Sequence, residues 1–258
     1  SLVGAGGEVL ATRTYPVTHA LSAGGYGLAF YSRRGARLYH LPIDYYAKAG
    51  RWDLDPMAFG GNPRVTTTLG PFCLSCHSDP PPGRARGDHF GEPLPPGVGC
   101  ERCHGPGRRH VQSLKAEDVL NPARLPARRQ LDVCTQCHQS TSPILRPGHD
   151  HFGFRAGAAL DGFRVNFLPE PAEPDRAILL AHSERLVRSA CWQGAPEVMT
   201  CTSCHDPHRS SFEQPPAFWD GKCMACHAQR GCTASPEARA ARDDHCVACH
   251  MARGPTAN

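Results

Sequence analysis

One short pattern, Cys-x-x-Cys-His, recurs six times along the 258 residues of this chain. It takes up twelve of the 14 cysteines, and in every copy a histidine directly follows the second cysteine. Any fold that the chain adopts must accommodate all six copies. They are Cys73, Cys76 and His77; Cys100, Cys103 and His104; Cys134, Cys137 and His138; Cys201, Cys204 and His205; Cys223, Cys226 and His227; and Cys246, Cys249 and His250.

The histidine decides between the chemistries that paired cysteines serve. Cysteine pairs also build zinc ribbons, redox dithiols and disulfide frameworks, but none of these needs a histidine at that position. Covalent attachment of c-type haem does need it, because the two thiols bond to the porphyrin vinyl groups and the adjoining imidazole reaches the iron. The sequence therefore predicts six haem c groups, each held by the two cysteines of one motif, with its histidine as proximal ligand.

The sixth ligand of each iron has to come from elsewhere in the chain. Met224 lies inside a motif and Met251 directly follows a proximal histidine, so methionine competes poorly. We therefore expect bis-histidine ligation throughout, with low reduction potentials because no thioether raises them. The expected distal ligands are His19, His110, His182, His208, His149, His151 and His245, while His40 and His89 are the remaining candidates.

Two of these candidates follow a motif very closely. His110 lies six residues after His104, too near to pass round the macrocycle to the opposite face of the same iron. Gly105-Pro106-Gly107 supplies a sharp turn between the two histidines. His208 stands in the same relation to the motif that ends at His205. We expect both to ligate the iron of a neighbouring haem, which would tie two cofactors together.

Glycine and proline limit regular structure. The chain holds 26 glycines and 25 prolines, about a fifth of its residues, against a usual share of roughly 12%. A protein core built from such a chain is small, so we expect the haems themselves to form the core. The predicted fold is haem-packed and mostly irregular, with several short α-helices and a small N-terminal β-hairpin.

The spacing of the motifs suggests how the chain is divided. Residues 1–70 hold no motif, and 25–43 are expected to form the hairpin, with its turn at Arg33-Arg34-Gly35. Residues 71–140 carry three motifs and would form one lobe, and 141–258 would form a helix and a second three-haem lobe. One continuous row of six haems is the alternative. Helices are expected over 174–192 and 236–251.

Location follows from the cofactor. No run of 18 apolar residues is present, so no membrane-spanning helix is expected. Haem attachment of this kind takes place outside the cytoplasm. We expect an exported protein, periplasmic or extracellular, with Ser1 as the start of a mature form whose signal segment was removed. Cys191 and Cys232 are expected to form a disulfide there, and two separately buried cysteines are the alternative.

The formal charge of +4 does not indicate a nucleic-acid partner. Six haems would add about twelve propionates and about six ferric charges, which leaves a net charge of about −2. The expected partners are redox proteins or extracellular electron acceptors, together with further copies of the same chain.

Several fragments resemble one known family. Residues 16–21 (PVTHAL), 97–111 (GVGCERCHGPGRRHV), 199–208 (MTCTSCHDPH) and 246–251 (CVACHM) are similar to multihaem cytochromes related to the tetrahaem electron acceptor of nitrifying bacteria. The resemblance implies electron transfer, with His19, His110 and His208 as distal ligands. The chain departs from the family by holding six motifs, so the resemblance does not say which histidine serves which haem. In size and haem density the chain also resembles cytochromes that polymerise into extracellular filaments.

Two classes of function follow. The first is an electron conductor, as a filament subunit or as a soluble periplasmic shuttle. The second is a reductase of nitrogen or sulfur oxyanions with one open iron. Related reductases often mark the catalytic haem with Cys-x-x-Cys-Lys, which this chain lacks, and its histidines exceed the ligands needed by three. The sequence therefore favours an electron carrier that is not an enzyme.

Overall fold

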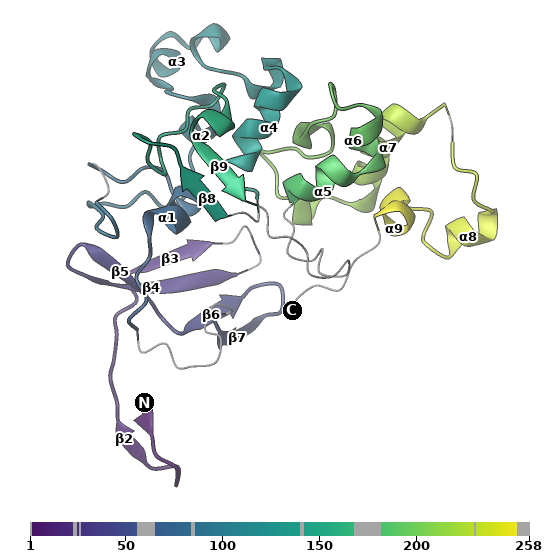
Figure 1. The fold of residues 1–258 in the computed structure, drawn as a ribbon. Coiled ribbons are helices and arrows are strands. Elements are labelled where there is room, and N and C mark those ends of the chain that lie inside the picture. The colour runs from purple at the N-terminus through teal and green to yellow at the C-terminus, as the bar shows by residue number, and fades with distance from the viewer. Residues whose placement is uncertain are drawn as a thin grey trace. The chain divides into compact units, whose positions relative to one another are not determined.

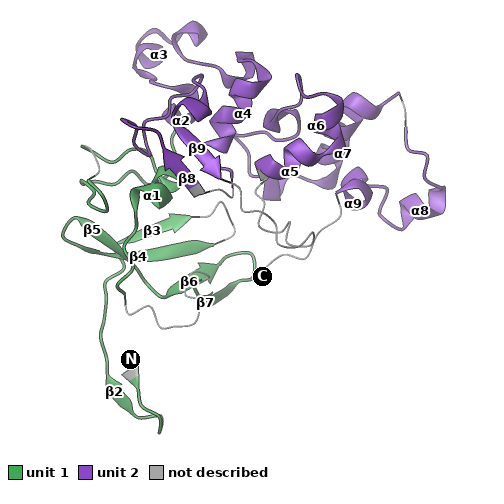
Figure 2. Cartoon of the chain, in the orientation of Figure 1, with its two compact units in different colours: residues 1–99 green, residues 100–258 purple. Residues whose placement is uncertain are grey.

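The computed structural model describes residues 2–22, 25, 27–55, 65–83, 86–139, 142–167, 182–229 and 231–251. The chain forms two compact units, residues 1–99 and 100–258 (Figure 2). The first motif belongs to unit 1, and the other five belong to unit 2. This division differs from the expected boundaries at residues 70 and 140.

Unit 1 is built on an antiparallel sheet, with strand order β3-β4-β6-β7 and β5 paired to β4 (Figure 1). A separate pair, β1–β2, precedes it. The strands are β1 (Leu2–Val3), β2 (Val9–Ala11), β3 (His19–Ser22), β4 (Leu28–Arg34), β5 (Arg37–His40), β6 (Ile43–Tyr46) and β7 (Arg51–Leu54).

The expected hairpin is present as β4 and β5. Its turn is Gly35-Ala36 and so begins two residues later than expected, because Arg34 still pairs with Arg37. Gly35 in that turn has a φ of 58°, the positive value that two-residue hairpin turns require. Sequence analysis did not predict that this hairpin is part of a larger sheet.

The first motif lies on helix α1 (Pro71–His77), directly after the sheet. Leu69 N–H donates to Leu38 O at 2.8 Å, which joins the chain before α1 to β5. Leu38 and Leu74 are both fully buried and Phe90 is 2% exposed, so these side chains belong to the core of unit 1. The core of unit 1 thus fixes the helix that carries this motif.

The described residues of unit 2 form short helices and one two-stranded sheet. Among the described residues the longest helix is α7, with 12 residues. The helices are α2 (Glu101–His104), α3 (Arg108–Ser113), α4 (Ala127–Thr135), α5 (His182–Arg188), α6 (Ala190–Gly194), α7 (Pro216–His227), α8 (Pro236–Ala240) and α9 (Cys246–His250), and the strands are β8 (Ser142–Leu145) and β9 (Arg164–Phe167).

Both expected helices are interrupted. The first falls partly on 168–181, outside the described residues, and its remainder is split into α5 and α6. Ser189 separates the two, and its hydroxyl accepts a hydrogen bond from Trp192 N–H as the N-cap of α6. The second is split into α8 and α9, because Asp243 and Asp244 between them have positive φ values of 53° and 56°. No described helix has the length and apolar character needed to cross a membrane.

Candidate haem-binding sites

Each motif lies on or next to a helical turn. The first, fifth and sixth lie on α1, α7 and α9, the second begins at the N-cap of α2, and the third and fourth begin at the end of α4 and in a 3₁₀ turn at Cys201–Ser203. The histidine N–H donates to the carbonyl of the first cysteine in three of them, at 2.9 Å for His104, 3.0 Å for His138 and 2.9 Å for His205. Residues three and four apart share one face of a helical turn. The backbone therefore brings both thiols and the imidazole of a motif to the same side.

All twelve motif cysteines are at least partly accessible to solvent. The first cysteines are exposed in two motifs and half-buried in four: Cys73 and Cys100, then Cys134, Cys201, Cys223 and Cys246. The second cysteines are half-buried in four motifs and exposed in two: Cys76, Cys103, Cys137 and Cys204, then Cys226 and Cys249. No motif therefore has its thiols closed off in a protein core, which suits their bonding to a porphyrin. The attachment itself stays a prediction for all twelve.

Three imidazoles are oriented by backbone carbonyls. His77 Nδ1 lies 3.0 Å from Ser22 O, His104 Nδ1 lies 2.8 Å from Leu120 O, and His110 Nδ1 lies 2.8 Å from Lys115 O. A carbonyl can only accept, so each Nδ1 carries the proton. The lone pair is then on Nε2, the nitrogen that is available to a metal ion. His77 and His104 are predicted proximal ligands, and His110 is a predicted distal one.

His245 is oriented by a carboxylate. Its Nδ1 lies 2.6 Å from Asp220 Oδ2 on α7, while Cys246 N–H donates to Asp220 Oδ1 at 2.8 Å. The hydrogen bond to His245 lowers the pKa of Asp220 and keeps the carboxylate charged. As with the other three, Nε2 is left as the coordinating nitrogen.

His104 and His208 lie close together with their rings nearly parallel. Their ring centres are 6.0 Å apart and their planes differ by 12°. A metal–imidazole bond is about 2.0 Å and the ring centre lies about 1.1 Å behind its nitrogen, so two imidazoles on one ion have centres about 6 Å apart. The pair therefore has the separation of two axial ligands on one iron.

Neighbouring motifs in unit 2 contact each other through their cysteines. Cys134 and Cys201 share a hydrogen bond, which raises the pKa of Cys134 and lowers that of Cys201. This contact joins the third and fourth motifs, which are far apart in sequence. Cys223 and Cys246 are also hydrogen-bonded, and join the fifth and sixth. With haem attached these sulfurs would be thioethers, so the contacts indicate position only.

The second and third motifs are linked by a buried glutamine. Gln136 lies inside the third motif and is 5% exposed. Its Nε2 donates to Arg102 O at 3.1 Å and to Val133 O at 2.8 Å. Arg102 lies inside the second motif, so this side chain connects helices α2 and α4. Contacts of this kind join motifs 2 to 3, 3 to 4 and 5 to 6.

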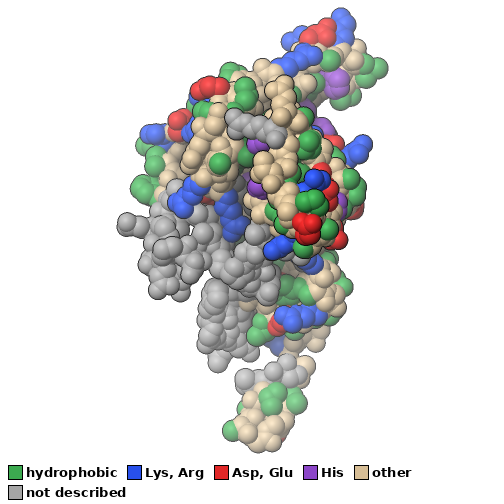
Figure 3. All heavy atoms as spheres, turned by 90° about the vertical axis from the view of Figure 1, so that its right-hand side faces the viewer, with side chains coloured by type: hydrophobic (Ala, Val, Ile, Leu, Met, Phe, Trp, Pro, Cys, Tyr) green, Lys and Arg blue, Asp and Glu red, His purple; other side chains and the backbone are tan. Residues whose placement is uncertain are grey.

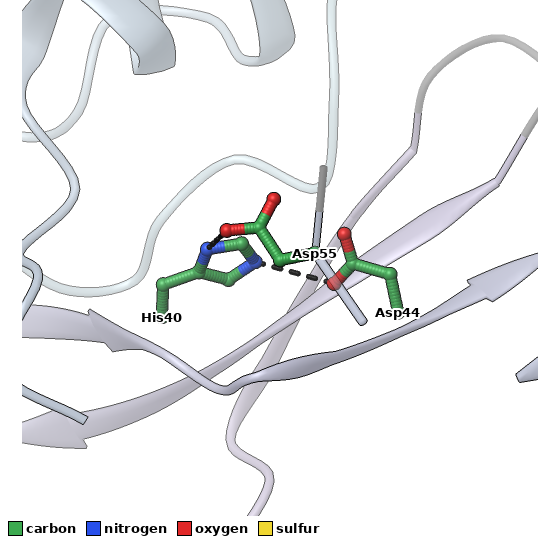
Figure 4. A group of neighbouring side chains, drawn as sticks. All are labelled: His40, Asp44 and Asp55. Carbon is green, nitrogen blue, oxygen red and sulfur yellow. Dashed lines mark hydrogen bonds and ion pairs between the residues drawn. The ribbon is translucent and has the colours of Figure 1, made fainter. Parts of the chain in front are cut away.

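His40 belongs to a different kind of cluster (Figure 4). Its Nε2 lies 3.2 Å from Asp44 Oδ1 and its Nδ1 lies 3.0 Å from Asp55 Oδ2. Ligand atoms of these three residues fall within 4.8 Å of one another, as they do in a metal site. However, both ring nitrogens already face carboxylates, an arrangement that a doubly protonated imidazolium satisfies. His40 is therefore not available as a haem ligand.

Protonation of His40 is favoured by its partners. Burial by itself lowers the pKa of His40, but the hydrogen bonds and charges of Asp44 and Asp55 outweigh burial and raise it. The ring of Tyr31 packs against His40 with centres 4.8 Å apart. Burial, together with the nearby charges of Asp44 and Asp55, raises the pKa of Tyr31, so its phenol stays neutral.

Known proteins with similar sequences are cytochromes. The family model described as "Cytochrome c554 and c-prime" matches residues 54–105, the segment that carries the first two motifs. An alignment of 152 residues with "Multiheme cytochrome MtrA" of Shewanella baltica (strain OS185) is 26% identical and covers 52% of this chain and 43% of that protein. The chain is a multihaem c-type cytochrome.

Two solved structures are similar to this cytochrome. The outer cell wall cytochrome OcwA shares 18% identity at a TM-score of 0.49, over 81% of this chain and 55% of that one. The undecahaem cytochrome from the S-layer of Carboxydothermus ferrireducens shares 17% identity at a TM-score of 0.45, over 92% of this chain and 44% of that one. The chain thus spans about half the length of each relative.

The residues of the cytochrome fit haem c. The cysteine pairs lie on or next to helical turns, the imidazoles anchored through Nδ1 offer Nε2, and the ring centres of His104 and His208 are 6.0 Å apart. Four of the proximal histidines are exposed in the structure: His138, His205, His227 and His250. Figure 3 shows histidine side chains at the surface beside hydrophobic ones. Exposed apolar and imidazole groups together suit a large apolar cofactor.

The remaining predicted ligands of the cytochrome are less defined. His19 is half-buried, with Nδ1 3.0 Å from Thr18 Oγ1, and burial lowers its pKa. His149 is exposed and its ring centre lies 4.5 Å from that of Phe163. His151 is half-buried, and burial and the charge of Arg164 lower its pKa. His182 begins α5, but its side chain lies outside the described residues. His89 is exposed beside Asp88.

The expected disulfide of the cytochrome is not formed in this structure. Cys191 and Cys232 are both free and both exposed, so neither the bond nor the alternative of two buried thiols is observed. Sequence analysis also missed the groups that orient the imidazoles. Ser22, Leu120 and Lys115 act through backbone carbonyls, which no side-chain pattern reveals. Asp220 lies three residues before Cys223 in a stretch without any other signal.

Proposed function

We propose that this cytochrome carries electrons through a row of six covalently bound haems, each with its iron held between two imidazoles. The observation that carries the proposal is the His104–His208 pair, whose separation of 6.0 Å matches two axial ligands of one iron. A bound haem supplies an iron that exchanges one electron with its neighbours. The chain supplies the imidazoles, fixes their orientation and joins adjacent motifs.

The covalent attachment of the proposal comes from the cysteines of the motifs. Each haem would be fixed by two thioether bonds, one from each cysteine of its motif. The pairs are Cys73 and Cys76, Cys100 and Cys103, Cys134 and Cys137, Cys201 and Cys204, Cys223 and Cys226, and Cys246 and Cys249. Their partial exposure and their place on helical turns support this role.

The ligand set of the proposal has two parts. The proximal ligands are the six motif histidines. Nδ1 anchors support His110 and His245 as distal ligands, and the pairing with His104 supports His208. His19, His149, His151 and His182 complete the set from which the other distal ligands come. An iron with two imidazoles has no position left for a substrate, which is why the proposal is a carrier and not a reductase.

Contacts between motifs support a continuous row. Cys134 and Cys201 meet although the chain between them is long, which favours one row over two separate three-haem lobes. The linkage between motifs 2 and 3 through Gln136 and between motifs 5 and 6 through Cys223 and Cys246 agrees with that reading. These contacts lie within unit 2.

Mass spectrometry and carbon monoxide binding test the proposal together. We expect the mass of the purified cytochrome to correspond to six attached haems. We also expect the fully reduced protein to leave its absorption spectrum unchanged under carbon monoxide, since that ligand needs an open iron. Fewer than six haems would contradict the row. A spectral change on addition of carbon monoxide would instead support the reductase with one open iron.

We further propose that the cytochrome is exported and that many copies of it assemble into an extracellular filament. A filament of this kind would need a histidine donated to the next copy. His40 cannot serve, because both of its nitrogens face carboxylates, which leaves His19 in the haem-free part of unit 1. Sedimentation at high protein concentration tests this: we expect polymers that disappear in His19→Ala, whereas monomers alone would favour a soluble shuttle.

A further inference from the structure

Among the predicted haem ligands with a defined Nδ1 anchor, His245 differs in the charge of its partner. His77, His104 and His110 rest on neutral backbone carbonyls, whereas His245 rests on the carboxylate of Asp220 at 2.6 Å. The second oxygen of this carboxylate accepts the Cys246 N–H at 2.8 Å, so both oxygens are fixed. In the described part of the chain, Asp220 forms no ion pair with lysine or arginine. The negative charge of Asp220 therefore acts mainly on the His245 imidazole.

We propose that Asp220 is a positioning residue that lowers the reduction potential of the iron bound by His245. This inference rests on the proposed function, in which His245 is a distal ligand. A carboxylate that accepts the Nδ1–H draws the proton toward itself and makes Nε2 a stronger electron donor. Stronger donation stabilises ferric over ferrous iron, as does the nearby negative charge. A neutral backbone carbonyl draws the Nδ1 proton less strongly and carries no net negative charge, so it lowers the reduction potential less.

Asp244 offers a matched control. It is the residue directly before His245 and carries the same charge, but its two oxygens bind Arg239 at 2.6 Å each. Its positive φ of 56° is well tolerated by asparagine. Asp220→Asn and Asp244→Asn each remove one negative charge close to His245. Only Asp220→Asn changes the hydrogen bond to the His245 ring.

The experiment is a redox titration of the full haem-loaded chain, followed by visible absorbance, for wild type and both variants. In D220N we expect one of the midpoint potentials to rise and the others to stay in place. A tenfold change in the ferric–ferrous equilibrium corresponds to about 59 mV for one electron, and we expect a shift of that order. D244N is expected to titrate like wild type.

Two results would overturn the inference. Identical titrations of D220N and wild type would leave Asp220 only the structural role of holding the start of α9. Equal shifts in D220N and D244N would show that charge alone acts, without the ring hydrogen bond. Where D220N does not retain its haems, Asp220→Ser is the second neutral variant; its hydroxyl can still accept from Cys246 N–H, and the same upward shift is expected.

His245→Ala separates this inference from the proposed function. If His245 is a ligand, this variant loses one low-spin haem in electron paramagnetic resonance and gains a high-spin one. An unchanged low-spin spectrum in H245A would remove His245 from the ligand set. Low-spin loss in H245A together with no shift in D220N would instead leave the ligation intact and contradict only the role of Asp220.

Discussion

His104 and His208 lie with their rings almost parallel, 12° apart, and their centres separated by 6.0 Å. His104 directly follows the cysteines of the second motif, and His208 lies three residues after the histidine of the fourth. Their contact brings a predicted distal ligand beside a predicted proximal one. It also connects the second motif with the chain around the fourth, both in unit 2.

Replacing His208 by alanine is expected to open one iron. Loss of one of two imidazoles converts a low-spin ferric haem to a high-spin one, and the reduced variant should then bind carbon monoxide. Electron paramagnetic resonance of the oxidised variant measures the change. His89→Ala is the control, since His89 is exposed beside Asp88 and is not among the proposed ligands. A spectrum of H208A that matches that of H89A would remove His208 from the ligand set.

Gln136→Leu is expected to destabilise unit 2. The buried amide of Gln136 satisfies the carbonyls of Arg102 and Val133. A leucine of similar size leaves those hydrogen bonds unmade, at a cost of about 1 to 3 kcal/mol in the free energy of unfolding. Urea unfolding followed by circular dichroism measures it. Gln193→Leu, at a residue of α6 whose amide only makes a long exposed contact with Arg188 O, should change stability by less than about 0.5 kcal/mol.

The His40 cluster is expected to stabilise unit 1 more at low pH than at high pH. Its partners raise the pKa of His40 in the folded state above the ordinary value of 6.5. A raised pKa means that the stabilisation is fully present below 6.5 and is lost as the pH rises through the folded pKa. The cluster is worth roughly 1 to 3 kcal/mol when charged.

His40→Gln tests this pH dependence, because glutamine can still donate to one carboxylate but cannot carry the charge. Unfolding free energies of wild type and variant are compared between pH 6 and pH 9. The difference between them should shrink as the pH rises. A difference that stays constant or grows with pH would show that His40 is neutral in the folded protein.

Leu38→Ala is expected to cost about 2 to 5 kcal/mol, because Leu38 is fully buried in β5 and its removal leaves a cavity. The loss should be seen in thermal unfolding of the haem-loaded protein. Leu54→Ala is the matched control, since Leu54 lies in β7 of the same sheet but is 59% exposed. Equal losses in the two variants would contradict the position of the core.

Local sequence patterns predicted the motifs and part of the sheet. The Cys-x-x-Cys-His repeat identified the six motifs, and in the structure each of them lies on, or begins at, a short helix or 3₁₀ turn. The Gly35 turn indicated the β4–β5 hairpin. The break between α8 and α9 could not be predicted, because it depends on Asp244 adopting a positive φ while its carboxylate binds Arg239. The sequence pattern there is compatible with a continuous helix.

Long-range contacts were the hardest part of the site to predict. Nothing in the sequence indicates that Cys134 meets Cys201 or that Leu120 O orients His104. Both contacts depend on how loops without regular structure fold back on the helices. The Asp220–His245 contact is of the same kind, since the two residues come from different helical segments. The candidate ligands could be named from the sequence, whereas the groups that orient them could not.

Electron paramagnetic resonance of the fully oxidised wild-type cytochrome tests most directly whether imidazole occupies both axial positions of every iron. The account predicts low-spin ferric signals that integrate to six spins per chain, with no high-spin signal. A high-spin component that integrates to one iron per chain would show an open coordination position and contradict it.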